Sequence, residues 1–368
     1  MPHNFIPVAA PVLNGNEKAY VLDCIETGWI SSSGKYIPRF EKEFAEWCGT
    51  KHAVACCNGT VALHLALLAL GIGPGDEVIV PTVTFVATAN AVHYVGATPV
   101  FADSERATWN LDPSDVAQKI TPKTKAIIAV HLYGHPADME TLALLAKKNG
   151  ITLIEDAAEA HGAEIRGRRA GSLGGVATFS FYGNKNLTTG EGGMCLTDNA
   201  ALGEKMRLLR GQGMDPQRRY WFPIVGYNYR MTNIAAALGC AQLEKADWHI
   251  GRRREVFAWY HELLAGLLGV SWQPTAEWAR HACWMFTALV RDEQTRDAVM
   301  LALHADGIET RPVFPPMHLL PPYEHLCKPG SLPVGEELSR RGLNLPTGAH
   351  LSREDVERVC ASLKAALA

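Results

Sequence analysis

The sequence lacks the features that would place it in a membrane or on a nucleic acid. Its 368 residues carry a net charge of −3, and no extended run of Lys and Arg forms a basic surface, so we expect no nucleic-acid partner. The start shows no basic leader followed by an apolar core. The most apolar run, residues 61–73, contains His64 and is too short to cross a bilayer. We therefore expect a cytoplasmic protein without a membrane partner.

Paired cysteines and metal-binding spacings are also missing. The nine cysteines are spread from Cys24 to Cys360 without a C-x-x-C motif. An odd number in a long chain is typical of free thiols in a reducing compartment. Cys56 and Cys57 are adjacent, which suits small buried side chains better than a disulfide. We expect no metal site.

Short β-rich runs alternate with helical runs between about residues 50 and 200, and Gly and Pro mark the connections. Uninterrupted Val and Ile runs, such as residues 77–81, are typical of parallel strands that are covered on both faces. The pattern predicts an α/β fold with a mainly parallel sheet. The glycine fingerprint of nicotinamide enzymes, G-x-G-x-x-G after a strand, is absent, because residues 171–175 have the wrong spacing.

The second part of the chain has a different pattern. A long helical stretch from about residue 233 to 267 is typical of a helix that links two domains, and a strand candidate at residues 284–290 follows. We predict a large domain over residues 1–245, with the N-terminal segment included, and a smaller C-terminal α+β domain over residues 246–368. No internal repeat or low-complexity tail is present.

One strand-to-helix turn has the composition of an anion site. Asn58, Gly59 and Thr60 open a helix, where free backbone N–H groups can hold a phosphate and a glycine lets it approach closely. Ser180 could add a hydroxyl to the same phosphate. An N-terminal cap without any ligand is the ordinary alternative.

Three further residues suit a flat, aldehyde-bearing cofactor. Asp156 follows an apolar strand and could keep a pyridine nitrogen protonated, although a helix-capping aspartate is the plain alternative. Phe85 could stack on the ring, or belong to the core. Lys185, in a polar loop before a glycine cluster, could supply the amine, or be a solvated charge. With the anion site, these residues describe a pyridoxal 5′-phosphate (PLP) site.

The motifs, taken in order, resemble the DegT/DnrJ/StrS family of sugar-nucleotide aminotransferases. That family adopts the aspartate-aminotransferase fold, PLP fold type I, and the resemblance covers nearly the whole chain. The resemblance is carried by residues 58–63 (NGTVAL), 81–92 (PTVTFVATANAV), 155–163 (EDAAEAHGA), 179–194 (FSFYGNKNLTTGEGGM) and 226–239 (GYNYRMTNIAAALG).

The resemblance implies roles for the candidate residues. Lys185 would bind PLP covalently and move the proton as the cofactor cycles with pyridoxamine 5′-phosphate. Asp156 would bind the pyridinium and Phe85 would cover the ring. The phosphate would be held by Gly59, Thr60 and Ser180.

Two more roles follow from the family resemblance. Asn228 would reach the phosphate from a neighbouring subunit, which makes the enzyme a homodimer with shared sites. Glu159 stands where many relatives have Gln, at the cofactor's phenolate oxygen, and a carboxylate there would be repelled unless a proton is shared. One branch of the family replaces the lysine with histidine and dehydrates the sugar, and Lys185 argues against that branch.

The implied reaction transfers an amino group from L-glutamate to the 4-keto group of a nucleotide-linked 4-keto-6-deoxy sugar. Residues 132–139, 181–194, 307–323 and 338–346 most resemble members of the family that act on GDP-4-keto-6-deoxy-D-mannose. The resemblance therefore implies this substrate, with a product used in a surface polysaccharide such as the lipopolysaccharide O-antigen. Candidate substrate contacts are Ser32, Lys35, Arg311 and His318. An aminotransferase for a UDP- or dTDP-linked keto sugar and a non-catalytic regulatory relative with the PLP fold remain alternatives.

Overall fold

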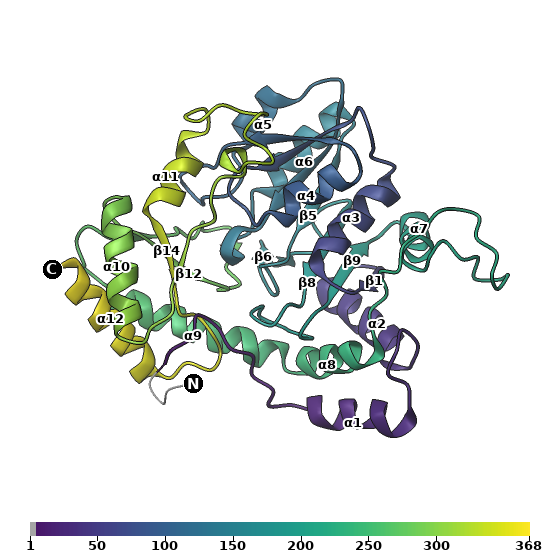
Figure 1. Cartoon of the computed structure of the whole chain (residues 1–368), viewed down its shortest axis with the longest axis horizontal. Helices are drawn as coiled ribbons and strands as arrows, with labels where there is room; N and C mark the ends of the chain where they lie inside the picture. Colours follow the sequence, from purple (N-terminus) through teal and green to yellow (C-terminus); the bar gives the residue numbers. More distant parts are fainter. Residues whose placement is uncertain (1–4) are drawn as a thin grey trace.

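The computed structural model describes residues 5–368, and its centre is a seven-stranded sheet in the order β1-β9-β8-β5-β4-β2-β3 (Figure 1). Strands β3, β2, β4, β5 and β8 are parallel, whereas β9 is antiparallel to its neighbours β8 and β1. The α/β class with a mainly parallel sheet is confirmed. The bounds are β1 (His52–Cys56), β2 (Glu77–Pro81), β3 (Thr98–Ala102), β4 (Thr124–Val130), β5 (Thr152–Asp156), β8 (Val176–Ser180) and β9 (Gly193–Thr197).

Both faces of this sheet are buried, as the apolar runs predicted. In β2, Val78 and Val80 join the core beneath α3 and α4, while Ile79 joins a second core beneath α5 and α6. Successive side chains of a strand point to opposite faces, so both faces must be apolar when both are covered. The covering helices are α2 (Tyr36–Cys48), α3 (Gly59–Leu70), α4 (Ala87–Tyr94), α5 (Pro113–Lys119), α6 (Met139–Asn149) and α7 (Ala200–Arg210).

The C-terminal part forms a smaller sheet in the order β10-β12-β14-β13, all antiparallel, with its own apolar core. Its strands are β10 (Ser271–Trp272), β12 (Phe286–Leu289), β13 (Arg311–Pro312) and β14 (Gly342–Leu345). Its helices are α9 (Ala246–Leu263), α10 (Glu293–Ala305), α11 (Pro333–Arg341) and α12 (Arg353–Leu367). A third sheet joins β6 (Glu164–Ile165) to β7 (Arg168–Arg169) and β11 (Ala279–Arg280), and two short 3₁₀ turns are η1 (Leu132–Gly134) and η2 (Met317–Leu319).

The helical stretch predicted from residue 233 is two helices. α8 (Asn233–Glu244) packs on α1 (Glu17–Thr27) and α2, and α9 leads on to the C-terminal core. Lys245, with φ −110° and ψ 13°, separates them, and no glycine or proline marks this break in the sequence. The division near residue 245 stays a prediction, because one further core joins Val83 and Tyr133 of the first part with Trp284 and Val313 of the second.

The N-terminal segment also contacts the C-terminal part of the chain. Ile6 forms a β-bridge with Ile308, and the Thr347 amide donates to the Val8 carbonyl. This pairing was not predictable, since nothing local marks its partner. The nine cysteines are all free thiols, as expected. Among residues 5–368 no helix has the length and apolarity needed to cross a membrane.

Candidate active site

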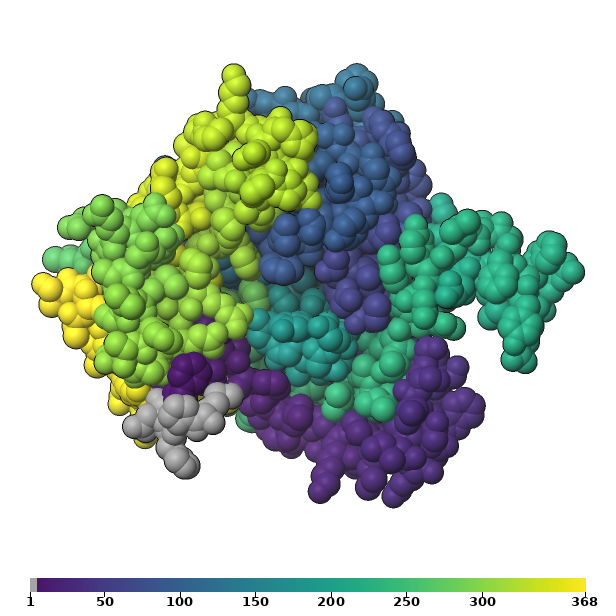
Figure 2. All heavy atoms as spheres, viewed as in Figure 1, coloured from purple at the N-terminus to yellow at the C-terminus, as the bar shows by residue number. Residues whose placement is uncertain are grey.

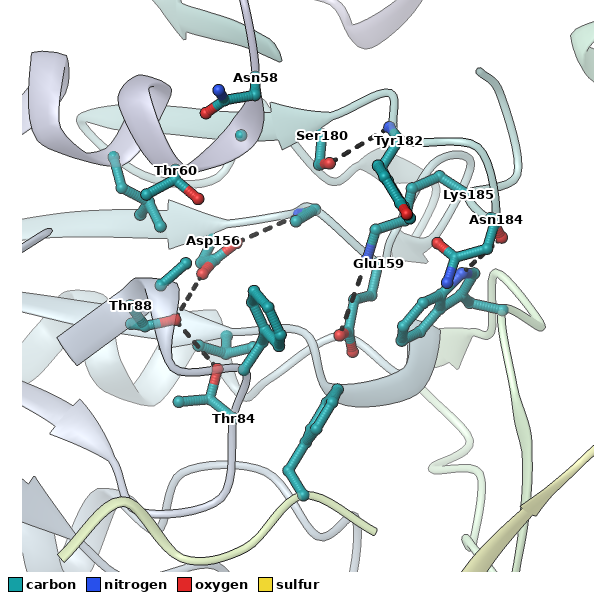
Figure 3. Close-up of a pocket in the computed structure, with 18 of the residues that line it drawn as sticks. Asn58, Thr60, Thr84, Thr88, Asp156, Glu159, Ser180, Tyr182, Asn184 and Lys185 are labelled. Atoms are coloured by element: carbon teal, nitrogen blue, oxygen red, sulfur yellow. Dashed lines mark hydrogen bonds and ion pairs between the residues drawn. The ribbon is translucent and has the colours of Figure 1, made fainter. Parts of the chain in front are cut away.

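A cavity of about 500 Å³ opens where β5 and β8 end and α3 begins. The carboxyl ends of parallel strands are the usual place for ligand sites in such sheets. Figure 3 shows side chains from these elements converging on it. Its polar lining consists of Asn58, Thr60, Thr84, Thr88, Asp156, Glu159, Ser180, Tyr182, Asn184, Lys185, Glu191 and Arg311.

One end of the cavity is the start of α3. The Asn58 side chain caps the helix by accepting from the Val61 amide at 3.0 Å. A Cβ at Gly59 would lie 2.7 Å from the Ser180 Cβ, so only glycine leaves this space open. The first N–H groups of a helix lack intrahelical partners and favour an anion. Together with the Thr60 and Ser180 hydroxyls, this end suits a phosphate.

The glycine cluster after Lys185 has a packing role beside this end. A Cβ at Gly193 would lie 2.2 Å from the Asn58 carbonyl oxygen. The close approach of β9 to the turn before α3 therefore requires glycine at position 193. The Lys185 loop itself is held by the Thr188 hydroxyl, which donates to the Phe181 carbonyl at 2.9 Å, and by the Thr189 hydroxyl, which donates to the Glu191 carbonyl at 2.7 Å.

Asp156 lies in the middle of the cavity, at the end of β5. Its Oδ2 accepts from the Thr88 hydroxyl at 2.8 Å, and Thr88 Oγ1 lies 3.0 Å from Thr84 Oγ1. Burial raises the pKa of the Asp156 carboxyl, against the hydrogen bonds from Thr88 and the Ala158 amide. Asp156 therefore faces the cavity as an acceptor, and it is not a helix cap.

Lys185 and Glu159 face each other at the other end of the cavity (Figure 3). The Lys185 Nζ lies 3.9 Å from Glu159 Oε1 and 3.7 Å from the centre of the Trp284 ring. Burial lowers the pKa of the Lys185 amine, and the Glu159 carboxylate opposes that shift. Burial raises the pKa of the Glu159 carboxyl to about 7, opposed by Lys185. Both shifts come mainly from burial, which disfavours the charged form of each group.

An aromatic wall extends from the lysine to the mouth of the cavity. Trp284 and Tyr133 stack at 6.1 Å, Tyr133 and Phe314 stack at 5.4 Å, and Phe314 meets Phe85 at 5.9 Å between ring centres. Tyr133 has φ +56°, an unfavourable value for a residue with a side chain, and its amide donates to Glu159 Oε2 at 2.7 Å. This backbone strain is thus located where Glu159 is oriented.

The structure brings most of the predicted residues together. Gly59, Thr60, Phe85, Asp156, Glu159, Ser180, Lys185 and Arg311 all line the cavity. Phe85 is 56% exposed and belongs to the cavity mouth, not to the core. Arg311 is half exposed and pairs with Glu309 at 3.2 Å.

Four predicted residues lie elsewhere. His318 is fully buried between Thr82 Oγ1, at 2.6 Å, and Glu336 Oε1, at 3.1 Å, so it has no free face toward the cavity. Lys35 pairs with Asp23 at 2.9 Å beside α1, close to Ser32. These two residues and Asn228 do not line this chain's cavity.

Asn228 lies on the segment of residues 211–230, which follows α7 and which we name the outer loop. Figure 2 shows this part of the chain standing out from the rest of the molecule. Asn228 is exposed and its Oδ1 accepts from Arg230 Nη2 at 2.9 Å. It therefore points at no cofactor-binding group of its own chain.

Sequence reasoning missed two side chains that shape the site. Thr88 lies one helical turn after Phe85, and this spacing could have placed both at the cavity. Trp284 is about a hundred positions from Lys185, so only the fold reveals that its ring meets the amine.

The residues of the cavity fit PLP. A helix start with an open glycine suits the phosphate, a buried carboxylate suits the pyridine nitrogen, and an amine of lowered pKa suits the aldehyde. Within residues 5–368, no group of three or more His, Cys, Asp or Glu side chains is arranged to hold a metal ion.

Comparison with known proteins places these observations in a family. The sequence profile of the DegT/DnrJ/EryC1/StrS aminotransferase family matches residues 11–364. The chain is 56% identical to a GDP-perosamine synthase of Caulobacter vibrioides over 97% of both chains, and 49% identical to one of Escherichia coli O157:H7 over 98% of both. A crystal structure of S. venezuelae DesV superposes with a TM-score of 0.90 at 42% identity, covering 95% of this chain and 94% of that one. The expected aminotransferase fold is confirmed.

Proposed function

The chain belongs to the DegT/DnrJ/EryC1/StrS aminotransferase family, and on this premise we propose that it makes GDP-perosamine. The reaction is the transfer of an amino group from L-glutamate to the 4-keto group of GDP-4-keto-6-deoxy-D-mannose. Two relatives at 56% and 49% identity carry the name GDP-perosamine synthase, which supports the GDP-linked substrate. The observation that carries the chemistry is the Lys185 amine facing Glu159 and Asp156 in one buried cavity.

We propose PLP as the cofactor, with its phosphate at Gly59, Thr60 and Ser180. When bound, it supplies an electron sink for the carbon that gains or loses the amino group. The Asp156 carboxylate binds the pyridine N–H and keeps that proton in place. Thr88 holds Asp156 for this purpose by donating to Oδ2 at 2.8 Å.

Lys185 and Glu159 handle protons beside the reacting carbon. The Lys185 amine, whose pKa is lowered by burial, can accept a proton and return it to the neighbouring atom. Glu159, with a pKa raised to about 7 by burial, can share its proton with the phenolate oxygen of the cofactor. This removes the repulsion that a bare carboxylate would cause at that position.

The mouth of the cavity takes the nucleotide sugar. Arg311 is the cation at this rim, and Phe85 and Phe314 offer apolar faces for the sugar ring. We propose a diphosphate contact for Arg311. His318 supports η2 from inside the fold, by its bonds to Thr82 and Glu336, and we assign it no substrate contact.

We propose a homodimer in which the outer loop of each chain completes the site of the other. The loop stands out from the rest of its own chain, which supports this arrangement (Figures 1 and 2). Large exposed apolar side chains occur on the outer loop and before α2, and such patches are typical of protein interfaces. They are Trp29, Ile30, Tyr220, Trp221 and Phe222. Asn228 would then reach the phosphate of the partner, and Ser32 and Lys35 would adjoin the interface.

The cellular setting is also a proposal. A nucleotide sugar and free thiols fit the cytoplasm, and the product suits synthesis of the O-antigen of lipopolysaccharide. The alternatives are an aminotransferase for a UDP- or dTDP-linked keto sugar and a non-catalytic relative.

A substrate panel tests the proposal. The purified enzyme is first loaded with PLP, and the absorption band of the bound cofactor is followed at roughly 400–430 nm. L-glutamate is then added. GDP-, UDP- and dTDP-linked 4-keto-6-deoxy sugars are then added separately, and products are identified by mass spectrometry. We expect glutamate to bleach the band and only the GDP-linked ketone to restore it. If only a UDP- or dTDP-linked ketone restores the band, the proposed substrate is wrong. If the protein never binds PLP, the proposed enzymatic activity is wrong.

A further inference from the structure

Arg253 of α9 is a buried cation whose guanidinium reaches the backbone of the Lys185 loop. Only 3% of the residue is exposed. Its guanidinium donates to four backbone carbonyls from three separate segments of the chain. The acceptors are Trp284 at 3.0 Å and Thr347 at 2.8 Å for Nη1, and Asn184 at 3.2 Å and Lys185 at 3.4 Å for Nη2.

These bonds close a ring around the lysine. The Trp284 indole N–H donates to the same Asn184 carbonyl at 3.0 Å, and the face of that indole lies 3.7 Å from the Lys185 Nζ. Arg253 therefore fixes both the backbone that carries the amine and the ring that covers it. We name Arg253, Trp284 and the carbonyls of Asn184 and Lys185 the lysine clamp.

The charge of Arg253 is not balanced in the usual way. Both Nη groups meet carbonyls and neither meets a carboxylate. Burial lowers the pKa of Arg253 to about 10, so the group stays protonated at neutral pH. Burial, and then Arg253, lower the pKa values of His249 and His350, and the pKa of His161 falls to about 3 by burial and the charges of Lys185 and Arg253. The cation is thus surrounded by neutral rings.

We propose that Arg253 is a positioning residue for transamination: it holds the Lys185 loop and Trp284 in register and keeps an unneutralised positive charge behind the amine. The inference rests on the proposed function, because it takes Lys185 as the residue that binds PLP. Arg253 touches neither the cavity nor the reacting atoms, and it acts only through Lys185 and Trp284.

The charge has a defined effect on the amine. After burial, the groups that set the pKa of Lys185 are the carboxylates of Glu159 and Asp156, which raise it, and the guanidinium groups of Arg253 and Arg311, which lower it. His161 stays neutral nearby. Arg253 thus favours the unprotonated amine, the form that attacks an aldehyde.

The chain supplies a matched control in the next residue. Arg254 is also partly buried and also donates to carbonyls, those of His281 and Gly162 at 3.4 and 3.1 Å, but it does not touch the lysine loop. We would compare wild type with Arg253→Gln, Arg253→Lys, Trp284→Phe and Arg254→Gln. Circular dichroism and size exclusion establish which variants are folded.

Two readouts are needed, and the first uses the cofactor-free protein. Acylation of Lys185 by a small anhydride is followed by mass spectrometry from about pH 6 to about pH 10, because only the unprotonated amine reacts. The midpoint reports the charge on the amine, and the plateau reports its accessibility. The second readout is the rate at which the loaded enzyme releases PLP to an excess of a trapping protein.

We expect Arg253→Gln to lower Lys185 acylation at pH 7 by about tenfold, with a midpoint at higher pH, because the repelling charge is gone. Arg253→Lys keeps the charge but cannot hold four carbonyls, so we expect a near-native midpoint and PLP release about tenfold faster. Trp284→Phe, which removes the indole N–H and puts a smaller ring beside the amine, should speed release by about threefold. Arg254→Gln should match wild type in both.

The result that overturns the inference is an Arg253→Gln midpoint and release rate equal to those of Arg254→Gln. If Arg253→Gln does not fold, native release rates in both Arg253→Lys and Trp284→Phe overturn it. The proposed function fails separately, when wild type carries no PLP on Lys185.

Discussion

The two ends of the cavity differ in how completely one chain builds them. At the inner end, Lys185 lies 3.9 Å from Glu159, Asp156 accepts from Thr88, and each charged group has partners from its own chain. At the mouth, Phe85 is 56% exposed and the half-exposed Arg311 pairs with the partly buried Glu309. Burying a charge without partners costs roughly several kcal/mol. The buried groups of the inner end therefore need partners that the fold of their own chain supplies.

The comparison separates chemistry from specificity. Under the proposed function, the inner end supplies the groups for cofactor binding and proton transfer, and the mouth takes the substrate and adjoins a second chain. Substitutions at the inner end should therefore change kcat. Substitutions at the mouth should change KM, or should have an effect only in the dimer.

The largest effect is expected at Lys185. Lys185→Ala removes the amine that binds PLP and carries the proton, so kcat should fall by about 10³-fold or more. Steady-state rates of amine formation measure this. The fold should be intact by circular dichroism, and more than about a tenth of native activity would place the chemistry elsewhere.

Asp156→Asn should follow. A neutral amide cannot keep the pyridine nitrogen protonated, so we expect kcat to fall by about 10²–10³-fold while KM changes little. Glu155 is the matched control, since it points to the opposite face of β5 and accepts from the amides of Gly171, Leu173 and Gly174.

Glu155→Gln should lower the melting temperature and leave kcat within about threefold of wild type. Equal kcat losses in the two variants would mean that Asp156 acts through stability alone.

Asn228→Asp tests whether the phosphate end of the cavity depends on a second chain. A carboxylate beside the phosphate should weaken PLP binding by about tenfold in the homodimer. Co-expression with Lys185→Ala should give heterodimers with one intact site, and differently tagged, isolated heterodimers should recover about half of native activity. Folded heterodimers as inactive as both parents would show that Asn228 serves its own chain.

Glu159→Gln should change how stability depends on pH. The folded pKa of about 7 lies above the ordinary 4.5, so the folded chain binds more protons between these values and the contribution of Glu159 to stability is lost as pH rises. The amide resembles the protonated form at every pH.

We therefore expect the melting temperature of the cofactor-free Gln variant, relative to wild type, to rise from pH 4.5 to 7, the range between the two pKa values. Glu191→Gln, at an exposed pocket position, is the control. A pH-independent difference would place the Glu159 pKa near its ordinary value.

The smallest effect is expected at Arg311. Arg311→Gln should raise KM for the nucleotide sugar about two- to fivefold with kcat nearly unchanged, because a half-exposed cation contributes little. Arg291→Gln, an exposed arginine paired with Asp292, should alter neither constant. A large loss of kcat in Arg311→Gln would mean that Arg311 acts with the groups of the inner end and not at the mouth.

What the sequence predicted follows the same division. The strands and the groups at strand ends were predictable, because Asp156 and Ser180 end apolar runs and Asn58 and Gly59 carry a local turn signal. The role of Trp284 was not predictable, because only folding brings it to Lys185, and the long helix was wrong at Lys245, where no residue signals the break.

Substrate contacts were the weakest predictions. His318 occurs in a proline-rich segment that resembles an exposed loop, yet its two ring nitrogens are used by Thr82 and Glu336 inside the fold. Whether a side chain near a cavity faces it depends on long-range packing. Ser32, Lys35 and Asn228 have the further difficulty that their neighbours would belong to another chain.

The central claim is that Lys185 holds PLP at the inner end of the cavity, and one measurement addresses it directly. Wild-type enzyme is reconstituted with PLP, reduced with borohydride, digested and sequenced by mass spectrometry. We expect the reduced cofactor on the peptide that contains Lys185 and no other lysine modified to a comparable extent. A cofactor attached to a different lysine, or no attachment at all, would contradict the account.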